Sequence, residues 1–256
     1  MIMRKIILCI TAVTGLLLFA CSGKQAQPEE IETDSLSVTI MKGDSAIYGL
    51  ACDGCTDSVI VLLPHDGSDP VTYDILNAKR EHKVIGRPKI GDNLAVLLNP
   101  ENPKEAVSVI DIDEMKGTWV YLVTPTLRKR VDTQAQHQDE AVDSALKKMM
   151  VPREYGFRLK RDKQVTSIGM AYRATTTDDQ SPIVYPQVRR YSEWHIFNGK
   201  LILVHPNYRV SSNGKAEQQS VELDTAEIVF MMKDSLQLRF KDGVKNYYRK
   251  NEENTK

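Results

Sequence analysis

Alternation of apolar and polar residues in the second half of the chain is the feature that most constrains its fold. In 154–161, and again in 235–241, apolar side chains occupy every second position and charged or polar ones lie between them. A period of two is typical of β-strands that have one face in a core and one in water. Similar runs bring the number of expected strands to eight, at 118–124, 164–173, 189–197, 200–205, 218–232 and 244–250. Eight strands make the smallest barrel that can hold a small ligand, so we expect an all-β barrel over 115–250.

The connections between these strands alternate in length. Tight turns follow the second, fourth and sixth strands, at 162–163, 198–199 and 233–234. Long segments follow the first, third and fifth strands, at 125–153, 174–188 and 206–217. The connection after the seventh strand, at 242–243, is an exception, because it is tight where the alternation requires a long segment. In an up-and-down barrel, alternate connections lie at opposite ends, so we expect one end of tight turns and one surrounded by long loops. Within the first long segment, 138–150 has a helical apolar period and charges that match a helix dipole.

Residues 36–112 predict a separate and smaller all-β unit. Seven short runs rich in β-branched residues are divided by turn-forming Gly, Asp, Asn and Pro, and no stretch has a helical period of useful length. This pattern predicts a small barrel or sandwich. The Gly-Asp turn at 91–92 is similar to turns of OB-type and SH3-like barrels. We expect 113–116 to be a short hinge.

The N-terminus carries a targeting signal. Arg4 and Lys5 precede an apolar stretch, 6–19, that is too short to span a membrane, and Ala20 and Cys21 follow. These residues resemble the lipobox of bacterial lipoproteins. The resemblance implies that the signal peptide 1–20 is removed and that Cys21 then carries acyl chains such as palmitate. The alternative is an ordinary secretory signal followed by a chance cysteine.

Lipidation of Cys21 would anchor the protein in the cell envelope, because several acyl chains hold a protein stably on a membrane. We expect the outer membrane, facing either the periplasm or the surface. The polar and acidic segment 21–35 is expected to be a flexible tether between lipid and fold.

Cys52 and Cys55 are the cysteines that remain once Cys9 is removed and Cys21 is lipidated. In an oxidising compartment the pair predicts a disulfide across the Asp-Gly turn between them. A redox-active pair and a metal site are the alternatives. No expected helix lies there to lower a thiol pKa, and two thiols lack the further ligands of a closed zinc site. The stretch 48–55 is similar to part of the envelope copper-stress lipoproteins, which combine a Cys-x-x-Cys strand, a lipocalin-like barrel and an OB-like domain. Here the cysteine pair lies outside the expected lipocalin-like barrel, so the function of those proteins is not carried over.

Gly117, Thr118 and Trp119 open the first barrel strand at the tight-turn end, and the last strand returns Arg249 to the same end. Together with the runs 191–194, 199–203, 224–225 and 234–238, these residues look like the lipocalin-like lipoproteins of Bacteroidetes. The arrangement itself resembles the lipocalin superfamily. There a Gly-x-Trp opens the first strand and an Arg of the last strand covers the Trp. The resemblance implies that Gly117, Trp119 and Arg249 form a closed barrel floor, with a cation–π contact, and that the opposite end admits a ligand. The helix expected between the first two strands departs from lipocalins and is similar to the lid of intracellular lipid-binding barrels.

Apolar residues expected to point into the barrel are the candidate ligand-binding residues. They are Tyr121, Val123, Phe157, Leu159, Ile168, Met170, Trp194, Leu203, Phe230, Leu238 and Phe240, with Ile196, Leu201 and Leu236 beside them. They would line an apolar pocket for a small hydrophobic ligand, or they would fill the barrel as a solid core.

Charge and motifs exclude several classes of function. The chain has 34 basic and 34 acidic residues, so the basic excess of a nucleic-acid binder is missing. Catalytic motifs and histidine spacings suited to a metal are also missing, so we expect no enzyme, no cofactor and no metal. The sequence therefore predicts an envelope lipoprotein that binds a small apolar ligand at its loop-rich end or presents loops to an envelope protein partner. The alternatives are a structural or interaction lipoprotein with a filled barrel and a redox or metal stress sensor that uses Cys52 and Cys55.

Overall fold

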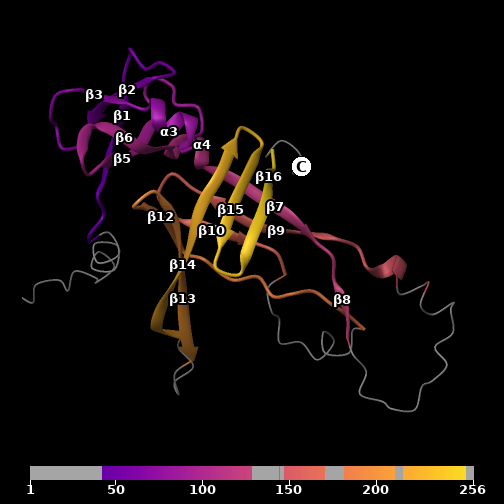
Figure 1. Cartoon of the computed structure of the whole chain (residues 1–256). Helices are drawn as coiled ribbons and strands as arrows, with labels where there is room; N and C mark the ends of the chain where they lie inside the picture. The colour runs from indigo at the N-terminus through magenta and orange to yellow at the C-terminus, as the bar shows by residue number, and fades with distance from the viewer. Residues whose placement is uncertain (1–41, 129–143, 145–146, 171–181, 211–215, 252–256) are drawn as a thin grey trace, which may run out of the picture. The chain divides into compact units, whose positions relative to one another are not determined.

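The computed structural model describes residues 42–128, 144, 147–170, 182–210 and 216–251 (Figure 1). The expected signal peptide, the tether, Cys21 and the first expected strand lie outside these residues. The described chain is all-β, as the alternating sequence predicts. Its strands form a six-stranded sheet, an eight-stranded sheet and a two-stranded sheet.

The six-stranded sheet contains the small barrel. Its strands are β1 (Ala46–Ala51), β2 (Val59–Pro64), β3 (Val71–Asp74), β4 (Val84–Ile85), β5 (Asn93–Asn99) and β6 (Asn102–Asp111). They are ordered β3-β2-β1-β5-β6-β4, and β3 also lies parallel to β6 through Asp74 and Glu105. This last pairing closes five strands into a barrel, which is one of the two forms expected, a small barrel or a sandwich.

Two short helices in this part of the chain differ from the expectations. α3 (Leu76–Arg80) follows β3, because the carboxylate of Asp74 accepts the Leu76 N–H at 2.8 Å and turns the chain. α4 (Ile112–Met115) replaces most of the expected hinge, and Asp111 caps it by accepting the Glu114 N–H at 2.9 Å. Each helix has five residues or fewer, which is too short to give a helical period in the sequence.

The eight-stranded sheet is the expected up-and-down barrel. Its strands are β7 (Gly117–Val123), β9 (Arg153–Leu159), β10 (Val165–Ile168), β12 (Glu193–Phe197), β13 (Lys200–Val210), β14 (Ala216–Met232), β15 (Ser235–Phe240) and β16 (Gly243–Arg249). Each strand but one pairs with the next along the chain, and β16 returns to pair with β7. A single bridge between Gln164 and Glu193 joins β10 to β12, so the barrel is nearly closed. This order shows a lipocalin-like fold.

One connection differs from the predicted pattern. The sequence predicts a long loop at 206–217, because Pro206 and Asn207 are typical of loops. In the structure β13 and β14 stay paired out to Val210 and Ala216, and their hairpin extends beyond the barrel (Figure 1). Pro206 is tolerated in a strand here because β12 pairs with β13 only as far as Val204, so beyond that residue one edge of β13 is free.

The other long connections lie partly outside the described residues. β8 (Thr126–Leu127) and β11 (Ile183–Val184) pair with each other as the two-stranded sheet. Within the expected helix 138–150, residues 144 and 147–149 are helical, and most of the remainder lies outside the described residues. β10 ends at Ile168 and β12 begins at Glu193, so both strands are shorter than the runs that predicted them.

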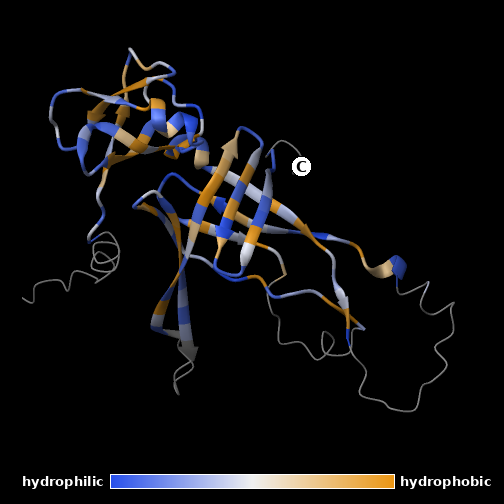
Figure 2. Cartoon of the chain, viewed as in Figure 1, coloured by the Kyte–Doolittle hydropathy of each residue, from blue (hydrophilic) through white to orange (hydrophobic). Residues whose placement is uncertain are grey.

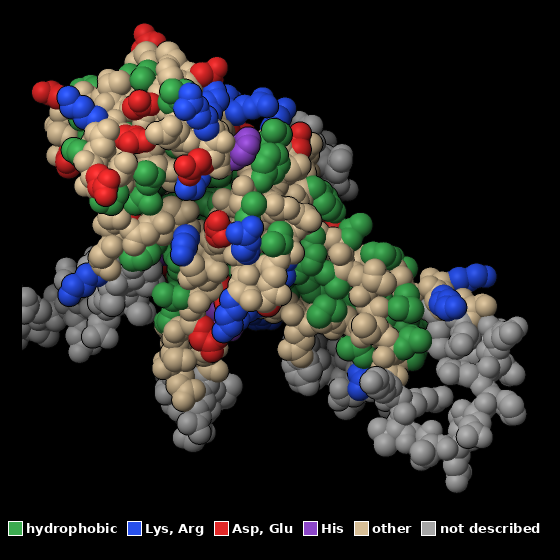
Figure 3. Space-filling view, in the orientation of Figure 1, with side chains coloured by type: hydrophobic (Ala, Val, Ile, Leu, Met, Phe, Trp, Pro, Cys, Tyr) green, Lys and Arg blue, Asp and Glu red, His purple; other side chains and the backbone are tan. Residues whose placement is uncertain are grey.

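The core of the large barrel is filled at its tight-turn end. Large side chains with 2% exposure or less occupy it: Trp119, Phe157, Leu159, Trp194, Leu201, Leu203, Leu236 and Leu238. Apolar and polar residues alternate along the strands of this sheet (Figure 2). On the face of the molecule that Figure 3 shows, basic and acidic side chains are interspersed. The filled end confines any ligand to the other end of the barrel.

Candidate ligand-binding site at the barrel mouth

The barrel floor has the expected members. The guanidinium of Arg249 lies over the Trp119 ring, with its central carbon 4.1 Å from the ring centroid. The Trp119 indole N–H donates to the carbonyl oxygen of Met115 at 2.8 Å, and the indole is fully buried. Arg249 also donates to the carbonyl oxygens of Lys116, at 2.6 Å, and Glu114. The floor is therefore a closed structural cap that joins the first and last barrel strands, β7 and β16, to α4.

Gly117 is required by this floor. Its φ of +128° is a conformation that favours glycine, and a side chain there would collide with the guanidinium of Arg249. The Gly-x-Trp spacing is thus explained by contact: the glycine makes room for the cation that covers the tryptophan.

A cavity of about 700 Å³ opens at the opposite end of the barrel. Its lining comes from β7, β9, β14, β15, β16 and the segments beside them: Tyr121, Tyr155, Gly156, Phe157, Pro186, Gln187, Val188, Arg189, Tyr191, Glu222, Leu223, Asp224, Thr225, Phe240, Lys241, Asp242, Lys245 and Tyr247. We call this cavity the barrel mouth. It lies at the loop-rich end, where the alternating connection lengths predict a binding site.

Aromatic rings form one part of the barrel mouth. The rings of Tyr121 and Tyr247 meet edge to face with centroids 5.2 Å apart, and Phe157 lies at the same distance from Tyr247. Tyr155 donates its hydroxyl to the carbonyl oxygen of Pro186 at 2.6 Å, which holds the segment before Arg189 against the barrel. These contacts give the mouth a rigid aromatic base.

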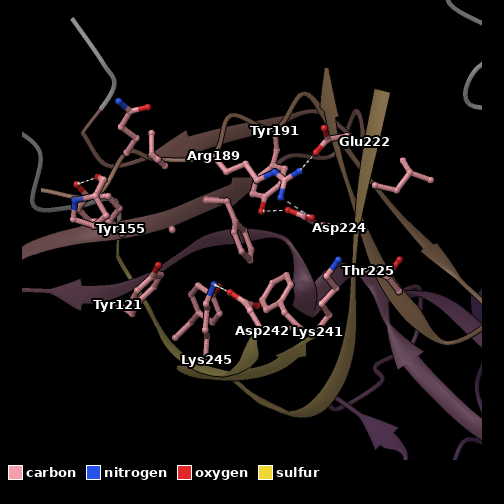
Figure 4. A pocket seen from close by; sticks show the side chains of 18 residues that line it. Tyr121, Tyr155, Arg189, Tyr191, Glu222, Asp224, Thr225, Lys241, Asp242 and Lys245 are labelled. Carbon is pink, nitrogen blue, oxygen red and sulfur yellow. Dashed lines mark hydrogen bonds and ion pairs between the residues drawn. The ribbon is translucent and has the colours of Figure 1, made fainter. Parts of the chain in front are cut away.

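Charged side chains form the other part. Arg189 contacts the carboxylates of Glu222 and Asp224, the latter at 3.1 Å, and Tyr191 donates its hydroxyl to Asp224 at 2.7 Å. In Figure 4 these side chains gather on one side of the cavity, and a second pair, Lys245 with Asp242, lies apart from them. Burial raises the pKa of the Tyr191 phenol, and the hydrogen bond to Asp224 raises it further. Tyr191 therefore stays a neutral donor at physiological pH.

The predicted ligand-binding residues divide between the mouth and the core. Tyr121, Phe157 and Phe240 line the barrel mouth. Leu159, Trp194, Leu203 and Leu238 are core residues, together with Ile196, Leu201 and Leu236. Val123 and Ile168 are half-buried outside the cavity lining, and Met170 is exposed. The expectation of a filled core therefore holds for the part of the barrel near the floor, and the expectation of a pocket holds for the mouth.

The strand pattern wrongly predicts that the Phe230 side chain points into the barrel. It is 40% exposed, whereas its neighbour Met231 is 5% exposed and belongs to the core. A register shift between Ile228 and Phe230 reverses the alternation in this part of β14. An extra residue in one strand moves every later side chain to the other face, and a period-two count does not detect it.

Sequence reasoning missed the polar half of the barrel mouth. Arg189 lies in the connection before β12 and Asp242 in the turn before β16, whereas Asp224 and Lys245 lie within β14 and β16. Charged residues at such positions are expected to be solvated. Of these four residues, Asp224 could most nearly have been predicted from the sequence. It pairs with Leu203 across β13 and β14, so its side chain points into the barrel. The sequence predicts an apolar pocket, and the structure instead has an aromatic base with charged walls.

Cys52 and Cys55 are both free thiols in the structure, so the expected disulfide is not formed there and stays a prediction. The Cys55 sulfur accepts the Val61 N–H at 3.3 Å and lies 3.2 Å from the carbonyl oxygen of Cys52. The Asp-Gly turn forms as expected, with Gly54 at a φ of +92°.

Across the described ranges, His, Cys, Asp and Glu side chains form no cluster of three or more suited to a metal. Among the described helices, none has the length and apolar character needed to cross a bilayer.

Comparisons with known proteins do not assign the chain to a family. No model of a known protein family matches the chain, and no curated protein matches it. A solved structure of a lipocalin-like protein from Bacteroides thetaiotaomicron is similar to it at 17% sequence identity, over 53% of this chain and 95% of that one, with a TM-score of 0.27. The lipocalin-like fold of the barrel rests on its strand order, β7 through β16 around a nearly closed sheet.

Proposed function

We propose that this protein is a lipid-anchored lipoprotein of the cell envelope whose lipocalin-like barrel binds a small hydrophobic ligand at its loop-rich end. The observation that carries the proposal is the barrel mouth, a cavity of about 700 Å³ above a filled core. Ligand pockets in proteins measure about 300–1,000 Å³ and are lined by aromatic residues with a few placed polar groups.

The division of the barrel supports binding at the mouth. The floor is sealed by Trp119 and Arg249, so a ligand enters and leaves at the opposite end. Large buried side chains fill the space between, and they hold the aromatic base of the mouth in place. A rigid, preformed pocket needs little reorganisation on binding, which favours affinity.

The envelope location rests on the sequence of the N-terminus. The lipobox-like residues before Cys21 and the polar segment 21–35 favour a lipid-anchored fold held away from the membrane surface. We place the anchor in the outer membrane. The role that we propose is binding without catalysis.

Native mass spectrometry of the protein extracted from its own membranes tests ligand binding. We expect a co-purified molecule of a few hundred daltons on a fraction of the protein. The Val188→Trp variant, which fills part of the mouth, should lose this mass, whereas Val244→Trp on an exposed strand position should keep it. A bare protein in every preparation would contradict the proposal and favour a structural lipoprotein.

The anchor has a separate test. A Cys21→Ser variant should lose its acyl mass and move from the membrane fraction to the soluble envelope fraction. A variant that stays in the membrane fraction would contradict lipid anchoring through Cys21.

A further inference from the structure

Two phenol hydroxyls in the barrel mouth have no hydrogen-bond partner among the described residues. Tyr247 is 6% exposed and lines the cavity, and Tyr121 lies in edge contact with it. The hydroxyls of Tyr155 and Tyr191, by contrast, donate to Pro186 and Asp224. Neither hydroxyl oxygen is fully buried, so each is open to a hydrogen bond with a water or a ligand in the cavity. The base of the mouth thus offers hydrogen bonds that the protein itself does not use.

The charges around the mouth balance. The lining contains three basic residues, Arg189, Lys241 and Lys245, and three acidic ones, Glu222, Asp224 and Asp242. Arg189 contacts two of these carboxylates and Lys245 contacts the third. The formal charges of the lining sum to zero, and five of its six charged side chains already contact an opposite charge, so a charged ligand would gain little net attraction to offset its loss of hydration. The mouth therefore favours an uncharged ligand.

The shape of the mouth favours rings over an extended chain. Below it, Trp119, Trp194 and Leu203 fill the barrel interior, so a long acyl chain finds no tunnel to enter. The base itself presents the rings of Tyr121, Phe157 and Tyr247, which pack best on another flat ring by offset or edge contact.

We propose that the barrel mouth recognises an uncharged, ring-bearing molecule that carries a hydroxyl or carbonyl group. The ring packs on Tyr121 and Phe157, and the polar group bonds to the hydroxyl of Tyr247. This inference rests on the proposed ligand-binding function and narrows its ligand class.

Equilibrium dialysis of the mature protein against four probes tests it: 2-naphthol, naphthalene, 2-naphthoate and n-decanol. We expect 2-naphthol to bind about three- to ten-fold more tightly than naphthalene, because one further hydrogen bond forms. We expect 2-naphthoate and n-decanol to bind at least about ten-fold more weakly than 2-naphthol. The carboxylate of 2-naphthoate is charged, and n-decanol is an extended chain without a ring.

A matched pair of variants assigns the hydrogen bond. Tyr247→Phe keeps the ring and removes the hydroxyl, so it should erase the advantage of 2-naphthol over naphthalene and leave naphthalene binding unchanged. Tyr248→Phe removes a hydroxyl on the adjacent residue, which is exposed and bonds to Glu154 outside the mouth, so it should change neither.

The inference is overturned if 2-naphthoate or n-decanol binds more tightly than 2-naphthol, if Tyr247→Phe leaves the difference in place, or if 2-naphthol does not bind. In each case, a co-purified mass that depends on an open mouth in native mass spectrometry would still support the proposed function. Absence of both probe binding and a co-purified mass would overturn the inference and the proposed function together.

Discussion

The guanidinium of Arg249 occupies the space that a side chain on residue 117 would need, and from there it covers the ring of Trp119. One residue of the last strand thus explains both ends of a three-residue motif at the start of the first. The same guanidinium donates to carbonyl oxygens at the end of α4, so it also connects the barrel to the segment before it. The motif is a structural device that closes the barrel and directs binding to the other end.

Replacement of Gly117 by alanine should therefore destabilise the protein by about 2–4 kcal/mol, through backbone strain and displacement of Arg249. Gly243→Ala is the matched control, since Gly243 has a φ of +135° but no atom within 4 Å of the place that its added methyl group would take. It should show the strain alone and lose less. Urea unfolding of both variants gives the comparison. Equal losses would mean that the contact with Arg249 is unimportant.

His195 should make stability depend on pH. It is 3% exposed, its Nδ1 has no partner among the described residues, and burial lowers its pKa below 6.5, against a weaker raising effect of Glu193. The unfolded chain therefore binds a proton more readily, and the free energy of unfolding should fall as pH drops below about 6.5, by up to about 1.4 kcal/mol per pH unit. Urea titrations from pH 7.5 to 5 measure it. His195→Leu should remove this fall, and His65→Leu, at an exposed position, should not.

Asp111 should have the opposite effect on the pH dependence of stability. Burial raises the pKa of this helix-capping carboxyl to about 6. The folded protein then holds the proton more tightly than the unfolded chain, so stability should fall as pH rises from about 4 through 6. Asp111→Asn keeps an acceptor for the Glu114 N–H and has no charge to bury. We expect it to exceed the wild-type stability by about 1–3 kcal/mol at pH 7 and to approach it at pH 4. A variant that is less stable at pH 7 would contradict this account.

The cysteine pair can be assigned by thiol counting. If Cys52 and Cys55 form a structural disulfide in the envelope, protein purified without reductant should show no reactive thiol, with or without added copper. A pair that reacts with thiol reagents, and is protected by copper, would favour the metal or redox sensor instead. Cys52→Ser with Cys55→Ser is the control for labelling at other sites.

The sequence predicts the barrel more completely than the site. Alternation in β9 and β15 and the Gly117–Trp119 spacing are local patterns that follow directly from strand pairing and close packing. The face of Phe230 depends on a bulge, and the continuation of β13 past Pro206 depends on which neighbour has already ended. Neither is encoded in a local pattern. The polar half of the mouth is hidden for a similar reason: Arg189 and Asp224 are distant in the chain, and only the closed barrel brings them to 3.1 Å.

The crystal structure of the protein purified from its own membranes tests the central claim most directly. We predict electron density for a small, ring-bearing molecule in the barrel mouth, in contact with Tyr121 and Phe157 and within hydrogen-bond distance of the Tyr247 hydroxyl. A mouth that holds only solvent, in protein that carries a co-purified mass, would contradict the account, because the ligand would then be bound elsewhere.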